Sequence, residues 1–298
     1  MKNNVIISIL VISFLPLVCF GADDLQFEGK SMDVWTKTLI GIPEQPYGPL
    51  PTVKMQEEAL AAFQRMGRRE YFFLVDQLIT TNAIAGWIPY VFKAAGSNAA
   101  PAIPKLIKTL DNEVPISWRA AESLKNIGTN SIPPLIAALD SKKLNVRKSA
   151  AYALGQIGPT AEPAVPKLLE RLNMDEISVR YDILTALGLI NQHPEKVVPA
   201  IIPYLSSDDS IIRGNAAFAM IGFGKNARAA APKLFKLMSD DNENVRINTA
   251  GALEHMEAGM GADYITLLKE NATNSDLKVR NFVLQQLTNR GVNTNSSK

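Results

Sequence analysis

An arginine that follows a β-branched residue recurs at a constant interval through the centre of the chain. The four copies are Val146-Arg147, Val179-Arg180, Ile212-Arg213 and Val245-Arg246. A proline recurs at the same interval and at a constant distance before each arginine, at Pro133, Pro166, Pro199 and Pro232. The period of about 33 residues falls in the range that is typical of solenoids and other arrays of small structural units. This repeat limits the fold more than any other feature of the sequence.

Each unit is predicted to contain two helices. After the proline, apolar residues at i, i+1 and i+4 lie on one helical face, as at Leu135, Ile136 and Leu139. A proline is tolerated at the first helical position because its N–H would have no partner inside the helix. Polar residues follow where the N-cap of a second helix is expected: Asp175, Asp209, Asn242 and Asp276. The second helix is rich in alanine, as in "VRKSAAYALGQIG", and is expected to stop at a glycine: Gly67, Gly128 or Gly158.

Weaker copies extend the repeat in both directions. "LKVRNFVLQQLTN" places Arg280 at nearly the same interval after Arg246, and "ISWRAAESLKNIG" carries Ser117 in place of the arginine. About eight helix pairs are predicted over residues 31–289. The predicted fold is all-α, an α-solenoid over residues 22–290 in which each unit buries its apolar face against its neighbours.

These residues resemble the HEAT-repeat family. The pattern "LLxxLxD…xVRxxAAxALGxIG" is near the family consensus and is best matched in residues 131–256. "FEGKSMDVWTKTL" is also similar to the opening segment of exported bacterial HEAT-repeat proteins. The resemblance implies a binding scaffold, and it implies that the recurrent arginine pairs with a turn aspartate to connect adjacent repeats. The expected arginine ladder comprises Arg147, Arg180, Arg213, Arg246 and Arg280.

The two ends of the chain are expected to lie outside the solenoid. Lys2 precedes an apolar stretch, Val5–Phe20, which is shorter than the roughly 20 residues that a membrane-spanning helix needs. We therefore expect a signal peptide, residues 1–21, that is cleaved near Gly21 and directs the chain to the periplasm or outside the cell. A lipoprotein anchor at Cys19 is the alternative. The tail, residues 291–298, is predicted to be disordered.

Residues that carry chemistry are few. Cys19 is the only cysteine, His193 and His255 are the only histidines, and no HExxH, GxSxG or GxGxxG motif occurs. We therefore predict no catalytic residue, no metal site and no cofactor. The net charge of +2 over 298 residues gives no general attraction to nucleic acid, and no integral membrane segment is expected after signal cleavage.

A partner is expected on the second helices, which line the concave surface in the resembled family. Counted from the arginine, positions +1, +5 and +8 form one stripe of each second helix outside its apolar face. On the middle units this stripe contains the predicted site residues Trp118, Lys125, Lys148, Tyr152, Tyr181 and Phe218. Aromatic residues beside small ones are typical of binding hot spots. The alternative is that these aromatics only fill gaps between repeats. The proline-rich segment "GIPEQPYGPLPT", residues 41–52, is a second candidate.

Three functions are consistent with these patterns. The favoured one is an exported, non-enzymatic scaffold that binds a protein or peptide on its concave face. A structural component of the cell envelope that assembles with itself or the cell wall is the second. The third is an enzyme similar to the HEAT-like bilin lyases, which attach tetrapyrroles to light-harvesting proteins.

Overall fold

The computed structural model describes residues 25–41, 43, 50–80 and 83–292. The expected signal peptide and most of the 41–52 segment lie outside the described residues, as do residues 293–298 of the tail. The predictions made for those segments therefore stay predictions. None of the helices in the described ranges is both long and apolar enough to cross a bilayer.

The described residues form a short hairpin followed by eight pairs of α-helices. The hairpin joins β1 (Gln26–Phe27) to β2 (Lys30–Ser31) in antiparallel register. The first helices of the pairs are α1 (Met32–Leu39), α3 (Arg68–Leu78), α5 (Ile103–Thr109), α7 (Ile132–Ala138), α9 (Val165–Met174), α11 (Pro194–Ile201), α13 (Ala231–Leu237) and α15 (Asp263–Asn271). The second helices are α2 (Val53–Arg65), α4 (Ile88–Ala95), α6 (Ile116–Ile127), α8 (Leu144–Ile157), α10 (Ile177–Ile190), α12 (Ser210–Phe223), α14 (Glu243–Met260) and α16 (Leu277–Asn289). Short 3₁₀ helices lie before or within several pairs: η1 (Ala83–Gly86), η2 (Gly96–Ala102), η3 (Thr129–Ser131), η4 (Gly158–Ala164), η5 (Ile202–Ser206) and η6 (Gly224–Ala230).

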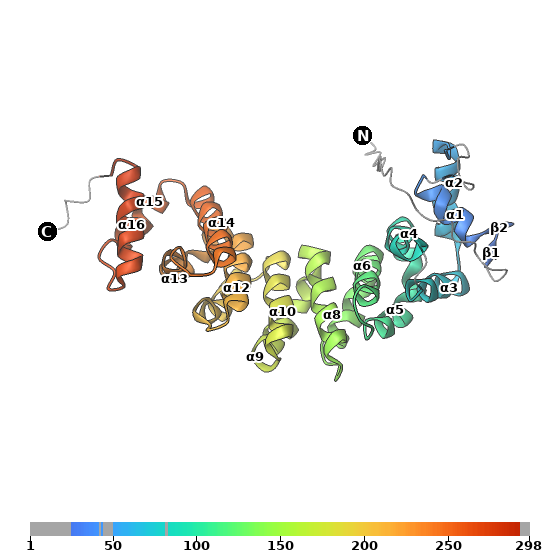
Figure 1. Ribbon diagram of the computed structural model, residues 1–298, viewed down its shortest axis with the longest axis horizontal. Helices are drawn as coiled ribbons and strands as arrows, with labels where there is room; N and C mark the ends of the chain where they lie inside the picture. Colours follow the sequence, from blue (N-terminus) through green and yellow to red (C-terminus); the bar gives the residue numbers. More distant parts are fainter. Residues whose placement is uncertain (1–24, 42, 44–49, 81–82, 293–298) are drawn as a thin grey trace.

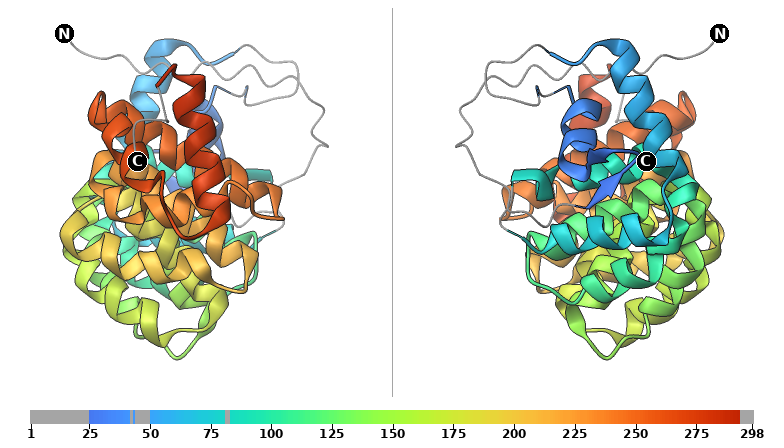
Figure 2. Two further views of the ribbon diagram at one scale, coloured as in Figure 1. Left: turned by 90° about the vertical axis from the view of Figure 1, so that its left-hand side faces the viewer. Right: turned by 90° about the vertical axis from the view of Figure 1, so that its right-hand side faces the viewer.

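The pairs stack into an arc, which confirms the predicted α-solenoid. The second helices lie on the inner side of the arc and the first helices on the outer side (Figure 1). Seen end-on, the first and last pairs rise on the same side of the molecule (Figure 2). Leu135 and Leu139 of the predicted apolar stripe are buried and Ile136 is half-buried, so this outer helix directs its apolar face into the shared core.

One outer helix begins earlier than the sequence predicts. Pro133, Pro166 and Pro232 lie at the second residue of α7, α9 and α13, close to the expected position. In contrast, α11 begins at Pro194, so Pro199 lies inside the helix. The α-helix then ends at Ile201 and continues as η5, because Pro203 has no N–H to donate to the carbonyl of Pro199.

The expected glycine stops are correct at two of three positions. Gly128 and Gly158 have φ values of +88° and +77° and end α6 and α8. Gly67 was expected to do the same, but its φ is −99° and it is the N-cap of α3. The helix before it, α2, ends at Arg65 without a left-handed residue.

Glycines set the distance between neighbouring inner helices. A Cβ added at Gly155 would lie 2.7 Å from Ala186 Cα, and one at Gly188 would lie 2.5 Å from Ala219 Cα. At Gly222 the added atom would be 2.3 Å from the carbonyl oxygen of Gly188. No real Cβ fits at such distances, so α8, α10 and α12 approach closely only because these positions lack side chains.

The last pair is placed differently from the others. Apart from its own partner α15, α16 packs mainly against the outer helix α13, whereas each inner helix from α4 to α12 packs against the next inner helix. Figure 1 shows α14 and α16 separated at this end of the arc. The regular stacking of inner helices therefore extends to α14.

We predict that Gly188→Ala lowers the free energy of unfolding by about 2–3 kcal/mol, because its methyl group would collide with the backbone of α12. Gly214→Ala on α12 is the matched control. Its methyl group would lie 3.6 Å from Asn248 Nδ2 and 3.7 Å from Val245 Cγ2, which is ordinary contact. The control should be neutral or more stable by up to about 1 kcal/mol, because alanine favours helix over glycine. Urea unfolding of both variants measures the difference, and equal stabilities would show that α10 and α12 are not packed this closely.

Candidate binding surface on the inner helices

The predicted site residues lie on four consecutive inner helices, and none of them is fully buried. Trp118 on α6 is 47% exposed. The other five are half-buried: Lys125 on α6, Lys148 and Tyr152 on α8, Tyr181 on α10, and Phe218 on α12. Tyr152 and Tyr181 also pack against the core, and part of each side chain remains accessible to solvent. The stripe is therefore available to a partner, although it also contributes to packing.

Trp118 and Tyr152 are joined by a chain of hydrogen bonds between α6 and α8. The indole Nε1–H of Trp118 donates to Tyr152 Oη at 3.1 Å, and Tyr152 Oη donates to Glu122 Oε1 at 2.8 Å. Lys125 Nζ lies 3.1 Å from Glu122 Oε2. Each polar end thus has a partner within the protein, which restricts the rotamers of both aromatic rings while much of the indole stays exposed.

Burial raises the pKa of the Tyr152 phenol, and its hydrogen bond to Glu122 acts in the same direction. The hydroxyl therefore remains protonated over the physiological range and continues to donate to Glu122. We call Trp118, Glu122, Lys125 and Tyr152 the aromatic network.

Asp182 on α10 lies next to this network and was missed at the level of the sequence. Burial raises its pKa to about 6, while the nearby Lys148 acts in the opposite direction. Asp182 also contributes to the raised pKa of Tyr152, so the two side chains share one electrostatic environment. A half-buried carboxyl with a shifted pKa beside exposed aromatic side chains is typical of functional sites. Its position two residues after Arg180 lies outside the stripe that was considered, which is why it was overlooked.

Tyr90 on α4 extends the aromatic row and was also missed. Its side chain is 42% exposed, and its ring centroid lies 5.6 Å from that of Trp87. Aligning the helix stop Gly96 with Gly128 places Tyr90 at the position of Glu122, which is position +5 of the stripe. The repeat register could therefore have found it, but α4 was not included in the stripe.

Tyr181 and Phe218 do not join the aromatic network. Tyr181 Oη donates to Asp209 Oδ2 at 3.0 Å, and Asp209 is the N-cap of α12. Both burial and this bond raise the pKa of Tyr181. Gly155 and Gly188 lie at position +8 of the same stripe, but they are buried against the next inner helix.

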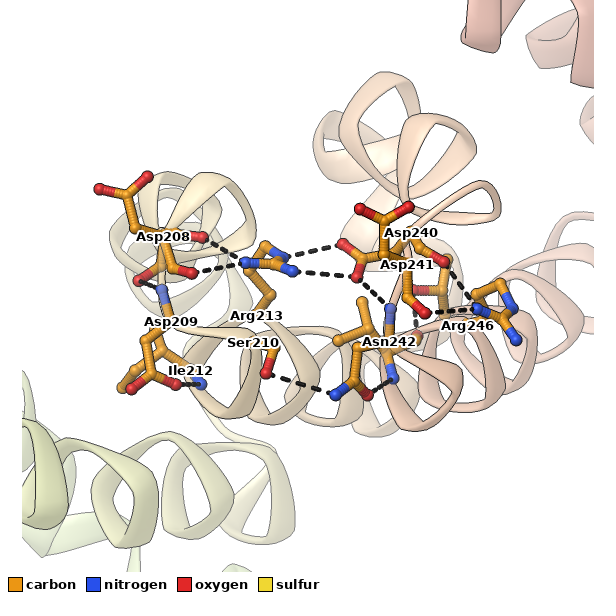
Figure 3. Close-up of polar contacts among 12 residues, drawn as sticks. Asp208, Asp209, Ser210, Ile212, Arg213, Asp240, Asp241, Asn242 and Arg246 are labelled. Carbon is orange, nitrogen blue, oxygen red and sulfur yellow. Dashed lines mark hydrogen bonds and ion pairs between the residues drawn. The ribbon is translucent and has the colours of Figure 1, made fainter.

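Two arginines of the ladder pair with carboxylates of the next repeat. Arg147 Nε lies 2.7 Å from Asp175 Oδ1, and Arg213 Nε lies 2.8 Å from Asp240 Oδ2. Each also donates from Nη1 to a carbonyl of its own turn, Ser141 or Ser207. Figure 3 shows Arg213 between its own turn and Asp240. The paired guanidinium holds the pKa of Asp240 below its usual value.

The other three arginines do not make this pair. Arg246 donates to the carbonyls of Asp240 and Asp241, and Arg280 donates to the carbonyl of Asn274, all in their own turns. The side chain of Arg180 makes no hydrogen bond within the described ranges, although its Nε is buried. Its guanidinium lies 6.0 Å from the centroid of the Tyr204 ring. The inter-repeat ladder is therefore discontinuous.

One of the predicted N-caps, Asp175, is wrong. Asp209, Asn242 and Asp276 do accept backbone N–H groups at the starts of α12, α14 and α16. Asp175 instead ends α9, and its carboxylate binds both Arg147 and Arg171. Glu176 occupies the N-cap of α10 without a side-chain bond to the helix, because its own carboxylate accepts a hydrogen bond from Arg147.

The two histidines lie apart from the aromatic network. His193 Nε2 lies 2.8 Å from Glu162 Oε1 in a connection between pairs, and His255 is exposed on α14. Among the described residues, no group of three or more histidine, cysteine or acidic side chains is arranged to hold a metal ion.

Comparison with known proteins identifies the family. The sequence profile described as HEAT repeats matches residues 103–188 and 198–288, which is more than half of the chain. The chain belongs to the HEAT-repeat family. The matched ranges extend from the start of α5 into α10 and from α11 into α16, so they take in most of the last six pairs. A search of curated proteins found no match.

Solved structures with similar folds share little sequence with this HEAT-repeat protein. An engineered protein is 22% identical over 75% of this chain and 96% of its own, with a TM-score of 0.42. A designed armadillo repeat protein in complex with the peptide (KR)4 is 19% identical over 76% of this chain and 100% of its own, with a TM-score of 0.41. The complex of CpcE and CpcF of phycocyanin lyase from Nostoc sp. is 21% identical, covers 82% of this chain and 98% of its own, and has a TM-score of 0.40.

Replacing an arginine that pairs with the next repeat should lower the free energy of unfolding more than replacing one that does not. Arg147→Ala removes one of two guanidinium groups from the buried Asp175 and should lower the free energy of unfolding by about 3 kcal/mol. Arg180→Ala removes no ion pair and should cost less than about 1 kcal/mol. Denaturant unfolding of the two variants side by side measures this difference. A cost for Arg180→Ala as large as that of Arg147→Ala would contradict the discontinuous ladder.

Asp182 should give the HEAT-repeat protein a distinctive pH dependence. Its pKa is about 6 in the folded chain against 3.8 ordinarily, so the penalty on folding grows as the pH rises from 3.8 to about 6, is complete above that, and is lost as the pH falls. The stability of Asp182→Asn relative to the wild type should therefore rise by about 1–3 kcal/mol between pH 4 and pH 8. Urea unfolding of both proteins at the two pH values tests this. If the difference in unfolding free energy between the two proteins does not change with pH, the Asp182 carboxyl is exposed to solvent and not buried.

Proposed function

We propose that this HEAT-repeat protein is a non-enzymatic scaffold that binds an extended protein segment along its inner face. The observation that carries the proposal is the aromatic network, in which an exposed indole is held by a hydrogen bond to a half-buried tyrosine. A partner that covers Trp118 gains the burial of a large apolar surface. It loses little side-chain entropy from the protein, because the rings of Trp118 and Tyr152 are already restricted.

The arrangement of aromatics favours an extended ligand. Tyr90, Trp118 and Tyr152 belong to three consecutive inner helices, and Tyr181 and Phe218 follow on the next two. Neighbouring packed helices are about 8–10 Å apart, so a ligand that contacts several of these side chains must run along the arc. A compact small molecule would reach only one or two of them.

The shifted pKa of Asp182 supports a polar contact next to the aromatic ones. A ligand cation or N–H placed at this carboxyl would relieve part of its desolvation and bring its pKa back toward 3.8. Binding of such a ligand would then release the proton of Asp182 below pH 6. The partner is therefore expected to carry a donor beside an apolar or aromatic side chain.

Site-specific photo-crosslinking tests the proposed face before the partner is identified. A photoreactive amino acid is placed at position 118 on the inner helix α6, and in a second protein at the exposed Asn173 of the outer helix α9. The proteins are irradiated with cell-envelope extract, and crosslinked polypeptides are identified by mass spectrometry. A polypeptide crosslinked at 118 and not at 173 is the expected result. Crosslinking at 173 alone would move the site to the outer face.

The partner identified in this way is then used in titrations. Trp118→Ala should weaken its binding about tenfold or more, as expected for a hot-spot aromatic. Tyr152→Phe keeps the ring and removes the hydroxyl that holds Trp118, so it should weaken binding by a smaller factor. Affinities unchanged in both variants would contradict the proposal. A concentration-dependent mass of the chain by itself would favour self-assembly, and absorbance of a bound bilin would favour the lyase-like alternative.

A further inference from the structure

A hollow lies between the N-terminal ends of α12 and α14, away from the aromatic network on α6 and α8. Its volume is about 200 Å³. The residues that line it are Ser210, Ile211, Gly214, Asn215, Asn242, Asn244 and Asn248. All of these side chains are uncharged, and most of them are asparagine or serine, which can form hydrogen bonds.

Two asparagines form the fixed walls of the hollow. Asn248 Nδ2 donates to the carbonyl of Gly214 at 3.0 Å, which joins α14 to α12. Asn242 Nδ2 donates to Ser210 Oγ at 3.3 Å, and its Oδ1 accepts the N–H of Asn244 at 3.0 Å, as Figure 3 shows in part. These bonds hold the shape of the hollow in the absence of a ligand.

The remaining polar groups of the lining are free to bind. The side-chain amides of Asn215 and Asn244 make no hydrogen bond to any residue in the described ranges, and neither the Oδ1 of Asn248 nor the hydroxyl hydrogen of Ser210 is engaged there. Carboxamides and hydroxyls both donate and accept. The hollow therefore offers several neutral donors and acceptors beside an accessible surface that is more apolar than polar.

Nearby charges do not extend into this set. Asp209 accepts the N–H groups of Ile211 and Ile212 at 2.7 and 3.1 Å, so the first turn of α12 is already capped. Arg213 is bound to Asp240. A charged ligand would lose its hydration without gaining a partner of opposite charge, and a neutral ligand is favoured.

The number of free groups distinguishes between neutral ligands. A peptide unit offers one N–H and one C=O, which would satisfy only part of the lining. A sugar ring carries several hydroxyls, each a donor and an acceptor, and also has apolar C–H faces. Ile211 is 56% exposed at the rim.

We propose that the hollow between α12 and α14 binds one ring of a neutral glycan, with Asn215, Asn244, Asn248 and Ser210 bonding its hydroxyls. Ile211 then contacts its C–H groups. This site is separate from the aromatic network and does not depend on the proposed binding of a protein segment.

Side-chain amide signals in ¹H–¹⁵N NMR spectra of the full chain test the site directly. The probes are methyl β-D-glucopyranoside, N-acetyl-D-glucosamine and N-acetyl-D-galactosamine, with N-acetylalanine methylamide as the peptide probe. At least one sugar should shift the side-chain amide signals of Asn215 and Asn248 in a saturable manner, with a dissociation constant on the order of millimolar.

Two variants separate binding from folding. Gly214→Ala places a methyl group in the hollow at ordinary contact distance, and Asn215→Ala removes an amide that makes no bond within the described part of the protein. Each should weaken sugar binding about fivefold or more, whereas Asn173→Ala on the outer helix α9 should leave it unchanged. Circular dichroism confirms that all three are folded.

Either of two results would overturn the proposal. The first is that no sugar shifts these amide signals at about 100 mM, a concentration that would detect even very weak binding. The second is that the peptide probe binds more tightly than every sugar. Neither result would bear on the aromatic network, whose test uses Trp118 and Tyr152.

Discussion

The close packing of consecutive inner helices is the constraint on which the rest of the structure depends. Gly155, Gly188 and Gly222 face the backbone of the neighbouring inner helix, where no side chain fits. Because the inner helices approach closely while the outer helices carry larger side chains such as Leu168 and Phe235, the stack curves toward the inner side. The same packing brings α6, α8 and α10 near enough for Trp118, Tyr152 and Asp182 to share one environment.

Ion pairs and hydrogen bonds between repeats supplement this packing. Arg147 and Arg213 connect their turns to the acids of the next repeat, whereas Arg180 makes no such pair, so the contact is missing between the repeats that contain α10 and α12. At that junction Tyr181 binds Asp209 instead, and Asp209 also caps α12. The two candidate sites flank the junction: the aromatic network lies on α6 and α8, and the asparagine-lined hollow lies between α12 and α14. A repeat protein can thus place different ligand chemistries on successive units of one scaffold.

Much of the fold follows from the repeat itself. The repeat of Arg147 to Arg246 together with its weaker copies predicts about eight helix pairs. The apolar stripes predict which face is buried, and the turn residues predict three of four N-caps. Asp175 shows where such inference fails, because a carboxylate close to the start of a helix can cap it or can bind an arginine of the preceding repeat. Only the position of Arg147 in space decides between these two uses. The start of α11 at Pro194 was missed for a similar reason, since Pro199 keeps the period without starting the helix.

The sequence by itself determined the α-solenoid and the residues that each second helix presents on its stripe, because these depend on periodicity along one chain. The resemblance to the HEAT-repeat family added the expectation that the second helices line the inner side. The sequence could not determine which stripe residues of neighbouring helices contact one another. The bond from Trp118 to Tyr152, the raised pKa of Asp182 and the free amides around Gly214 all depend on the distance between neighbouring helices. That distance is set by the glycines and alanines of two repeats together. The sites are therefore properties of the stacked repeats, and only the tertiary structure decided them.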